Sequence, residues 1–91
     1  MEKVTEKDLD GILLRLNTIT RNPKMYMVDH VIQPGNYHLD GAFGGWSLRQ
    51  TTNNLGGETD VLGSGYTTKK HLYELISAYI KGYLARKGEE S

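Results

Sequence analysis

Apolar side chains recur with helical spacing near both ends of the chain, and shorter alternating segments lie between them. The first stripe consists of Leu9, Ile12, Leu13, Leu16 and Ile19. The second stripe consists of Leu72, Leu75, Ile76, Tyr79, Ile80, Tyr83 and Leu84. Steps of three and four residues place each set on one face of an α-helix. The pattern therefore predicts one amphipathic helix near each end of the chain.

The first helix is predicted to begin at Thr5 and to end at Asn22-Pro23. The Thr5 hydroxyl can accept a hydrogen bond from the first turn, and Asp8 can reach back to the Thr5 backbone, as in a capping box. Proline moves the residue before it out of the α-helical region, so Asn22 marks the end.

The second helix is predicted to follow Thr67 or Thr68, either of which can serve as its N-cap, and to run to about Arg86. Gly88 then supplies a residue that readily adopts the left-handed conformation of a helix stop. Neither helix would be stable alone in water, so each must bury its stripe against other elements.

Between the helices, alternation of apolar and polar residues predicts three short β-strands, over residues 36–40, 46–51 and 59–62. Glycine-containing turns over residues 41–45 and 53–57 are predicted to join them. The side chains that we expect to face the helices are Tyr37, Leu39, Trp46, Leu48 and Val61.

Residues 24–35 leave two alternatives open, a short edge strand or an irregular segment, before a turn at Pro34-Gly35. The complete pattern predicts an α+β fold in the order α-β-β-β-α, with both helices packed on one face of a three-stranded antiparallel meander. Because 91 residues leave no room for a second core, we expect one domain over residues 1–91, with an ordered core over about residues 5–87.

Composition excludes several kinds of chemistry. The 11 basic and 11 acidic side chains balance, so the chain as a whole has no electrostatic attraction to nucleic acid or to an anionic membrane. The absence of cysteine excludes disulfides, thiolate catalysis and cysteine-ligated zinc. No segment approaches the roughly 20 apolar residues of a membrane helix. We expect a cytoplasmic protein without cofactor or membrane contact.

The strongest candidate for a ligand site is the glycine turn that leads into the second helix. Gly63, Ser64 and Gly65 can present backbone N–H groups at a helix N-terminus, and Lys69 and Lys70 follow within a few residues. This geometry favours an anion. The alternative is a solvated helix start with two lysines that only promote solubility.

The same segment resembles the end of a double-stranded RNA-binding domain, a family with the α-β-β-β-α order and a Lys-Lys pair at the start of its last helix. The resemblance implies that Lys69 and Lys70 contact phosphates, and Arg49 is a further candidate for nucleic-acid contact. The chain departs from the family in its neutral charge and in the residues after the lysines, which are His71 and Leu72 rather than alanines.

A longer resemblance covers most of the chain. The segments LNTITRNP, GNYHLDGAFGGWSL and GSGYTTKKHLYELISAYIKGY occur in this order, as in a group of small uncharacterised proteins encoded in phage and prophage genomes. Residues 24–33 are shorter and more apolar than is typical of that group. The resemblance implies a bacterial or phage-infected host cell and at most an accessory or host-interacting role, and the group has no established activity that could be transferred to this chain.

The face of the sheet away from the helices is a candidate partner surface. Asn36, His38 and Ser47 are expected on it, and Phe43 lies in the adjoining loop. Such a face or a free sheet edge can bind another protein or a second copy of the chain. Phe43 can equally fold back over the edge of the core.

Two further kinds of site receive little support from the residues. His38 and Asp40, with His30 nearby, are few ligands for a metal site. Glu58 and Asp60 share a strand face, but paired catalytic carboxylates need a cleft that a chain of this size scarcely forms. The sequence therefore predicts a non-catalytic, protein-binding accessory protein, with nucleic-acid binding as the alternative.

Overall fold

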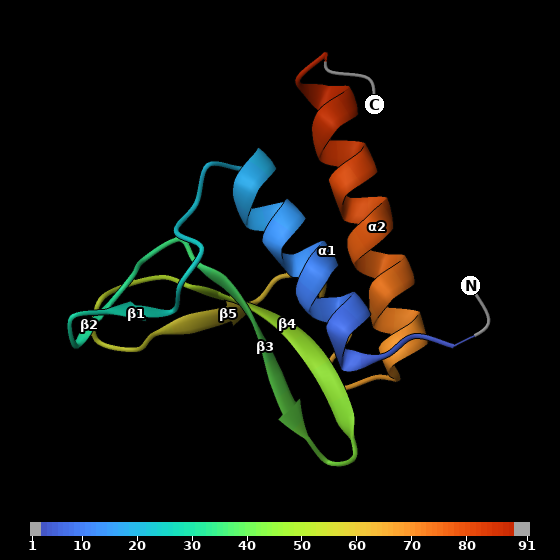
Figure 1. Cartoon of the computed structure of the whole chain (residues 1–91), viewed down its shortest axis with the longest axis horizontal. Helices are drawn as coiled ribbons and strands as arrows, with labels where there is room; N and C mark the ends of the chain where they lie inside the picture. Colours follow the sequence, from blue (N-terminus) through green and yellow to red (C-terminus); the bar gives the residue numbers. More distant parts are fainter. Residues whose placement is uncertain (1–2, 89–91) are drawn as a thin grey trace.

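Seven elements follow one another in the computed structural model, which describes residues 3–88 (Figure 1). They are α1 (Glu6–Ile19), β1 (Met27–Val28), β2 (Val31–Ile32), β3 (Tyr37–Ala42), β4 (Gly45–Thr51), β5 (Glu58–Asp60) and α2 (Lys69–Arg86). β3, β4 and β5 form an antiparallel meander, and β1 and β2 form a separate two-stranded sheet. The predicted α+β class and the helix–strands–helix order are confirmed, with one hairpin more than expected.

Both ends of α1 follow from local hydrogen bonds. The Thr5 hydroxyl accepts from the Asp8 amide at 3.2 Å, and the Asp8 carboxylate accepts from the Thr5 amide at 2.9 Å, so the predicted capping box is present. The helix ends at Ile19, before the predicted Asn22-Pro23. Arg21 adopts a left-handed conformation with φ 58°, and the Asn22 amide then donates back into the last turn.

The limits of α2 agree with the prediction. Thr68 is the N-cap, and its hydroxyl accepts from the His71 amide at 3.1 Å. The helix runs to Arg86, and Gly88 has a φ of 74°, which is typical of the residue that terminates a helix.

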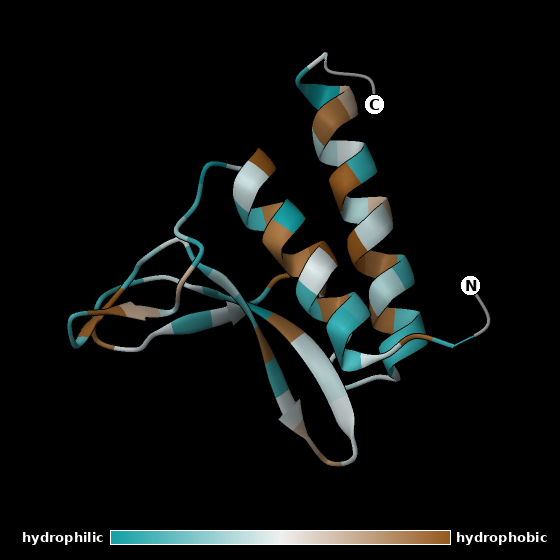
Figure 2. Cartoon of the chain, in the orientation of Figure 1, coloured by the Kyte–Doolittle hydropathy of each residue, from teal (hydrophilic) through white to brown (hydrophobic). Residues whose placement is uncertain are grey.

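The two helices lie side by side and cover one face of the meander (Figure 1). Their apolar faces supply most of the core, and the meander supplies the opposite wall, where Tyr37 and Leu48 are buried and Trp46 is partly buried. The fully or almost fully buried apolar side chains are Val4, Leu9, Ile12, Leu16, Tyr37, Leu48, Leu72, Ile76, Ile80 and Leu84. Figure 2 shows apolar residues along both helices and again on the β1–β2 hairpin, which projects beyond the area that the helices cover.

Asn17 is a buried polar residue on α1 that joins the helix to the sheet. Its side-chain amide donates to the Tyr37 carbonyl at 3.0 Å, and its side-chain oxygen accepts from the Tyr37 amide at 2.9 Å. These two bonds satisfy the outward-facing backbone groups of β3 at this point, as a neighbouring strand would. The free edge of β3 is therefore partly closed by a side chain.

The turn between β3 and β4 is tighter than predicted. It contains only Phe43 and Gly44, both with positive φ (54° and 73°), instead of a loop over residues 41–45. A two-residue turn in which both residues have positive φ matches the twist of the strands that it joins. The strands can therefore continue to the turn and include Gly41 and Gly45. The Trp46 ring covers Gly41, where a Cβ atom would lie 3.3 Å from the ring.

The third strand of the meander is displaced from its predicted position. β5 is Glu58–Asp60 instead of residues 59–62, although the Val61 amide still donates to the Leu48 carbonyl at 3.2 Å. The chain then leaves the sheet and returns at Thr67, which exchanges backbone hydrogen bonds of 2.8 and 2.9 Å with Trp46. Residues 62–66 consequently form a loop beside β4.

Within residues 24–35, β1 and β2 form a hairpin outside the meander, and the other residues of the segment lie in bends and turns. Asp29 and His30 make the two-residue turn of the hairpin, with φ 49° and 66°. The predicted turn at Pro34-Gly35 is present, since Gly35 has φ 95° and the Asn36 amide donates to the Gln33 carbonyl at 3.2 Å. No helix among the described residues combines the length and the hydrophobicity that a membrane span requires.

Candidate functional site

The face of the meander away from the helices is polar, as the alternation predicted. The strand register places His38 opposite Arg49, Asp40 opposite Ser47, and Arg49 opposite Asp60. Two other segments cover part of this face. The loop over residues 62–66 brings Tyr66 onto it, and the chain before β1 brings Tyr26 against His38, with ring centroids 4.9 Å apart.

Tyr66 joins the charged residues at the centre of this face. Its hydroxyl donates to the Asp40 carboxylate and accepts from the Arg49 guanidinium at 3.2 Å. The guanidinium also lies 5.4 Å from the centroid of the Tyr66 ring. The hydrogen bond to Asp40, with a smaller contribution from burial, raises the pKa of Tyr66. The phenol therefore stays neutral at physiological pH. Its contacts with the guanidinium hold Arg49 against the sheet.

Phe43 extends this cluster to the end of the β3–β4 hairpin. Its ring lies edge-to-face with Tyr66 at 5.3 Å, yet 92% of the residue is exposed. Its φ of 54° belongs to the left-handed region, which glycine and asparagine adopt at much lower cost than an aromatic residue. We use the name tip cluster for Phe43, Tyr66, Asp40 and Arg49.

His38 forms the other polar contact on this face. Its Nε2 lies 3.0 Å from the Glu58 carboxylate, and its Nδ1 lies 3.5 Å from the Thr51 hydroxyl. Only 17% of the His38 side chain is exposed. The residue therefore connects β3, β4, β5 and the chain before β1, which explains its burial without a ligand.

Two members of the predicted partner surface are not accessible, and the prediction is wrong for them. Asn36 is 1% exposed, and its side-chain amide donates to the Pro23 carbonyl at 2.8 Å. Ser47 is 0% exposed, because the chain is bonded to β4 on both sides of it, at Leu48 and at Trp46. Of the four predicted partner residues, His38 remains partly accessible and Phe43 is fully accessible.

The glycine turn of the predicted anion site already binds a carboxylate of the same chain. The Gly63 and Gly65 amides donate to the two oxygens of Asp60, each at 3.1 Å. An external phosphate would have to displace Asp60, so these amides do not form an open anion site. The sequence signal that could have revealed this arrangement is the aspartate placed three residues before Gly63.

The basic residues of the predicted nucleic-acid site do not share one surface. Lys69 lines a shallow groove of about 460 Å³ with Glu6 and Trp46. Trp46 and Arg49 are three positions apart on β4, so their side chains lie on opposite faces of the sheet. Lys70 is exposed at the start of α2. The structure therefore separates Arg49 from the groove that Lys69 lines.

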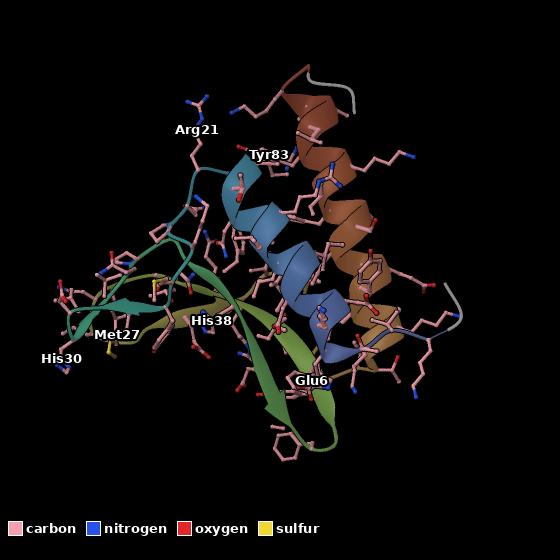
Figure 3. The ribbon with its side chains drawn as sticks, viewed as in Figure 1. Glu6, Arg21, Met27, His30, His38 and Tyr83 are labelled. Atoms are coloured by element: carbon pink, nitrogen blue, oxygen red, sulfur yellow. The ribbon has the colours of Figure 1, made fainter. Side chains whose placement is uncertain are left out.

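The possible metal ligands also remain apart. His30 lies at the tip of the β1–β2 hairpin, whereas His38 lies within the meander (Figure 3). Within residues 3–88, no three histidine or acidic side chains are grouped in a way that could hold a metal ion.

Comparison of the chain with protein-family models, with curated proteins and with solved structures gives no match. The residues and their geometry are therefore the basis for the function.

Proposed function

We propose that this chain is a non-catalytic protein-binding domain, an accessory protein of the phage or prophage type that acts inside a bacterial cell. Phe43 is the anchor that the partner protein receives. The proposal depends on one observation above all: an aromatic side chain that is 92% exposed on a backbone conformation that disfavours it.

Phe43 is unfavourable for folding in two respects. A non-glycine residue in the left-handed region costs about 1 kcal/mol or more, and asparagine or glycine would relieve this cost. The exposed ring also gains little from burial in the folded chain. A residue with both disadvantages is well explained by a contact outside the chain, and buried aromatic anchors contribute much of the affinity of protein interfaces.

The surroundings of Phe43 hold the ring in place before binding. The turn has only two residues, and the edge-to-face contact with Tyr66 restricts the ring from one side. Tyr66 is itself held by Asp40 and Arg49. Such preorganisation lowers the entropy lost on association, because fewer rotatable groups become fixed.

The polar side chains on this face are hydrogen-bonded within the chain, which supports a role without catalysis. Asp40 accepts from Tyr66, Asp60 accepts from two backbone amides, and His38 contacts Glu58. Groups that act as general acids, bases or nucleophiles need access to a substrate, which these contacts restrict.

The decisive experiment compares wild type with Phe43→Asn, which keeps the turn and removes the ring. Both proteins are immobilised, and proteins retained from bacterial lysate are quantified by mass spectrometry. Leu55→Asn is the matched control, since Leu55 is an exposed loop residue (88%) outside the tip cluster. A protein retained by wild type and Leu55→Asn is then purified, and its affinity for Phe43→Asn is expected to fall at least tenfold. If wild type, Leu55→Asn and Phe43→Asn retain the same proteins in equal amounts, the proposal is refuted.

Nucleic-acid binding is the alternative, and the groove that Lys69 shares with Trp46 favours it, because a cation beside an aromatic ring suits a stacked base and its phosphate. Duplex RNA, duplex DNA and single strands are titrated at low salt, with the double variant Lys69→Glu/Lys70→Glu as comparison. Binding that weakens steeply with salt and disappears in the variant would establish this alternative. No binding by wild type eliminates it.

A further inference from the structure

The β1–β2 hairpin carries an apolar surface that the rest of the chain does not cover. Met25 is 63% exposed and Val31 is 51% exposed, and the other members are similarly accessible. We use the name hairpin surface for the apolar residues Met25, Tyr26, Met27, Val28 and Val31. Exposed apolar side chains gathered on one element in this way are typical of a surface that associates with another chain.

The hairpin also has a free backbone edge. The Gln33 amide donates to the Tyr26 carbonyl at 2.9 Å, so Tyr26 and Gln33 form a hydrogen-bonded pair. Bonded and non-bonded pairs alternate in an antiparallel ladder, so the next pair, Met27 and Ile32, directs its N–H and C=O groups outward. The ladder therefore does not use the N–H and C=O groups of Met27 for bonds to β2.

We infer that two copies of the chain associate through this surface, with β1 of each copy pairing antiparallel to β1 of the other around a two-fold axis at Met27. The edge is complementary to itself in this arrangement: each Met27 N–H donates to the Met27 C=O of the second copy. Figure 3 shows Met27 on the hairpin, on the side of the molecule away from the helices.

The side chains fit this register. With Met27 opposite itself, Tyr26 of one copy lies opposite Val28 of the other, and an aromatic residue beside a β-branched residue is a favourable cross-strand pair. The exposed parts of both residues, 39% and 44%, are available for that contact.

The contacts and the charge also favour a second copy. Pairing of β1 with β1 would cover the exposed parts of Tyr26, Met27 and Val28 on each copy, and a small interface of this kind is expected to be weak and reversible. The formal net charge is zero, so two copies do not repel each other as wholes.

The absence of cysteine allows a direct test of the register. In Met27→Cys, the only two thiols of a dimer would face each other across the two-fold axis, at a Cα separation of about 5.5 Å that suits a disulfide. Mild oxidation is expected to give a disulfide-linked dimer in high yield. Leu14→Cys is the control, because Leu14 is an exposed apolar residue on α1 (53%) and should give only slow, random cross-linking.

Sedimentation equilibrium supplies a second measurement that needs no cysteine. Wild type is expected to show a monomer–dimer equilibrium between about 1 and 100 µM, and Val31→Asp to weaken it at least tenfold while retaining the circular dichroism spectrum of wild type. A wild type that stays monomeric at several hundred micromolar would overturn the inference, as would equal cross-linking of Met27→Cys and Leu14→Cys. Phe43→Asn should dimerise like wild type, so this inference and the proposed function can fail separately.

Discussion

The β1–β2 and β3–β4 hairpins are built alike and are used differently. Each turns through two residues with positive φ, Asp29 and His30 in one and Phe43 and Gly44 in the other. The side chains of the β3–β4 hairpin that face the helices form a wall of the core, whereas Met27, Val28 and Val31 of β1 and β2 are exposed. The difference is that the two helices cover the β3–β4 hairpin and do not cover the β1–β2 hairpin.

The outer edges of the two hairpins differ in the same way. Asn17 of α1 satisfies both backbone groups of Tyr37 on β3, and no equivalent side chain within the described residues reaches Met27 on β1. A helix that covers a sheet can therefore also close its edge. The hairpin without a helix keeps both an apolar surface and free hydrogen-bonding groups, which are the features that a partner uses.

The largest contrast is expected for apolar truncations in the two hairpins. Leu48→Ala removes a side chain that is fully buried in β4, and should reduce the free energy of unfolding by about 3 kcal/mol. Val28→Ala, on the uncovered hairpin, should change it by less than about 0.5 kcal/mol in the monomer. Urea unfolding of both variants at low concentration measures the difference. Similar losses for both would show that the β1–β2 hairpin is part of the core.

The contribution of edge closure is tested by Asn17→Leu. Leucine has a similar volume but cannot bond to Tyr37, so a buried amide and a buried carbonyl lose their partners. We expect a loss of about 2 kcal/mol, from the cost of unpaired buried backbone groups. Hydrogen exchange at the Tyr37 amide should accelerate more than exchange at the Leu48 amide. Unchanged exchange at Tyr37 would contradict the role of Asn17.

Alkaline pH should weaken the covered hairpin. Burial, and then the hydrogen bond to the Tyr79 hydroxyl at 3.3 Å, raise the pKa of Tyr37 well above its usual value. The unfolded chain therefore loses this proton first, near pH 10, and stability falls as the pH rises further. We expect a loss of about 1 kcal/mol from Tyr37 near pH 11. Unfolding by urea at pH 8 and pH 11 should show a smaller difference in Tyr37→Phe than in wild type.

The smallest expected effect has the opposite sign. Phe43→Asn relieves the left-handed strain at the tip of β3–β4 and should stabilise the chain by about 0.5–1 kcal/mol, or raise Tm by several degrees. Asp29→Asn, in the matching position of the β1–β2 turn, should change Tm much less because aspartate already tolerates this conformation. Thermal unfolding of both variants gives the comparison, and destabilisation by Phe43→Asn would show that the ring contributes to folding.

Much of the fold could be predicted because its signals are local. The stripes at Leu9 and Leu72, the capping box at Thr5 and the stop at Gly88 depend on neighbours within a few residues, and each is present as expected. The early end of α1 was missed because Arg21, rather than a glycine, takes the left-handed position. The two-residue turn at Phe43 was missed for the same reason, since neither arginine nor phenylalanine usually indicates a positive φ.

The candidate site could be predicted much less well. The alternation of β3 and β4 placed His38 and Arg49 on the polar face, but which parts of that face are covered depends on Tyr66 and Tyr26, which come from other segments. Ser47 is enclosed and Phe43 is exposed although both are near the same turn. Alternation assigns a residue to a face, and only the path of distant segments decides whether that face is open.

By itself, the sequence determined the two helices, the meander and the apolar wall that they share, because periodicity, capping and turn chemistry act between residues close in the chain. The tertiary structure alone decided that Asp60 occupies the glycine turn, that Asn17 closes the edge of β3, and that no helix covers β1 and β2. These features join residues far apart in the chain or depend on where whole elements pack. Their energies arise from contacts and burial that no local pattern encodes.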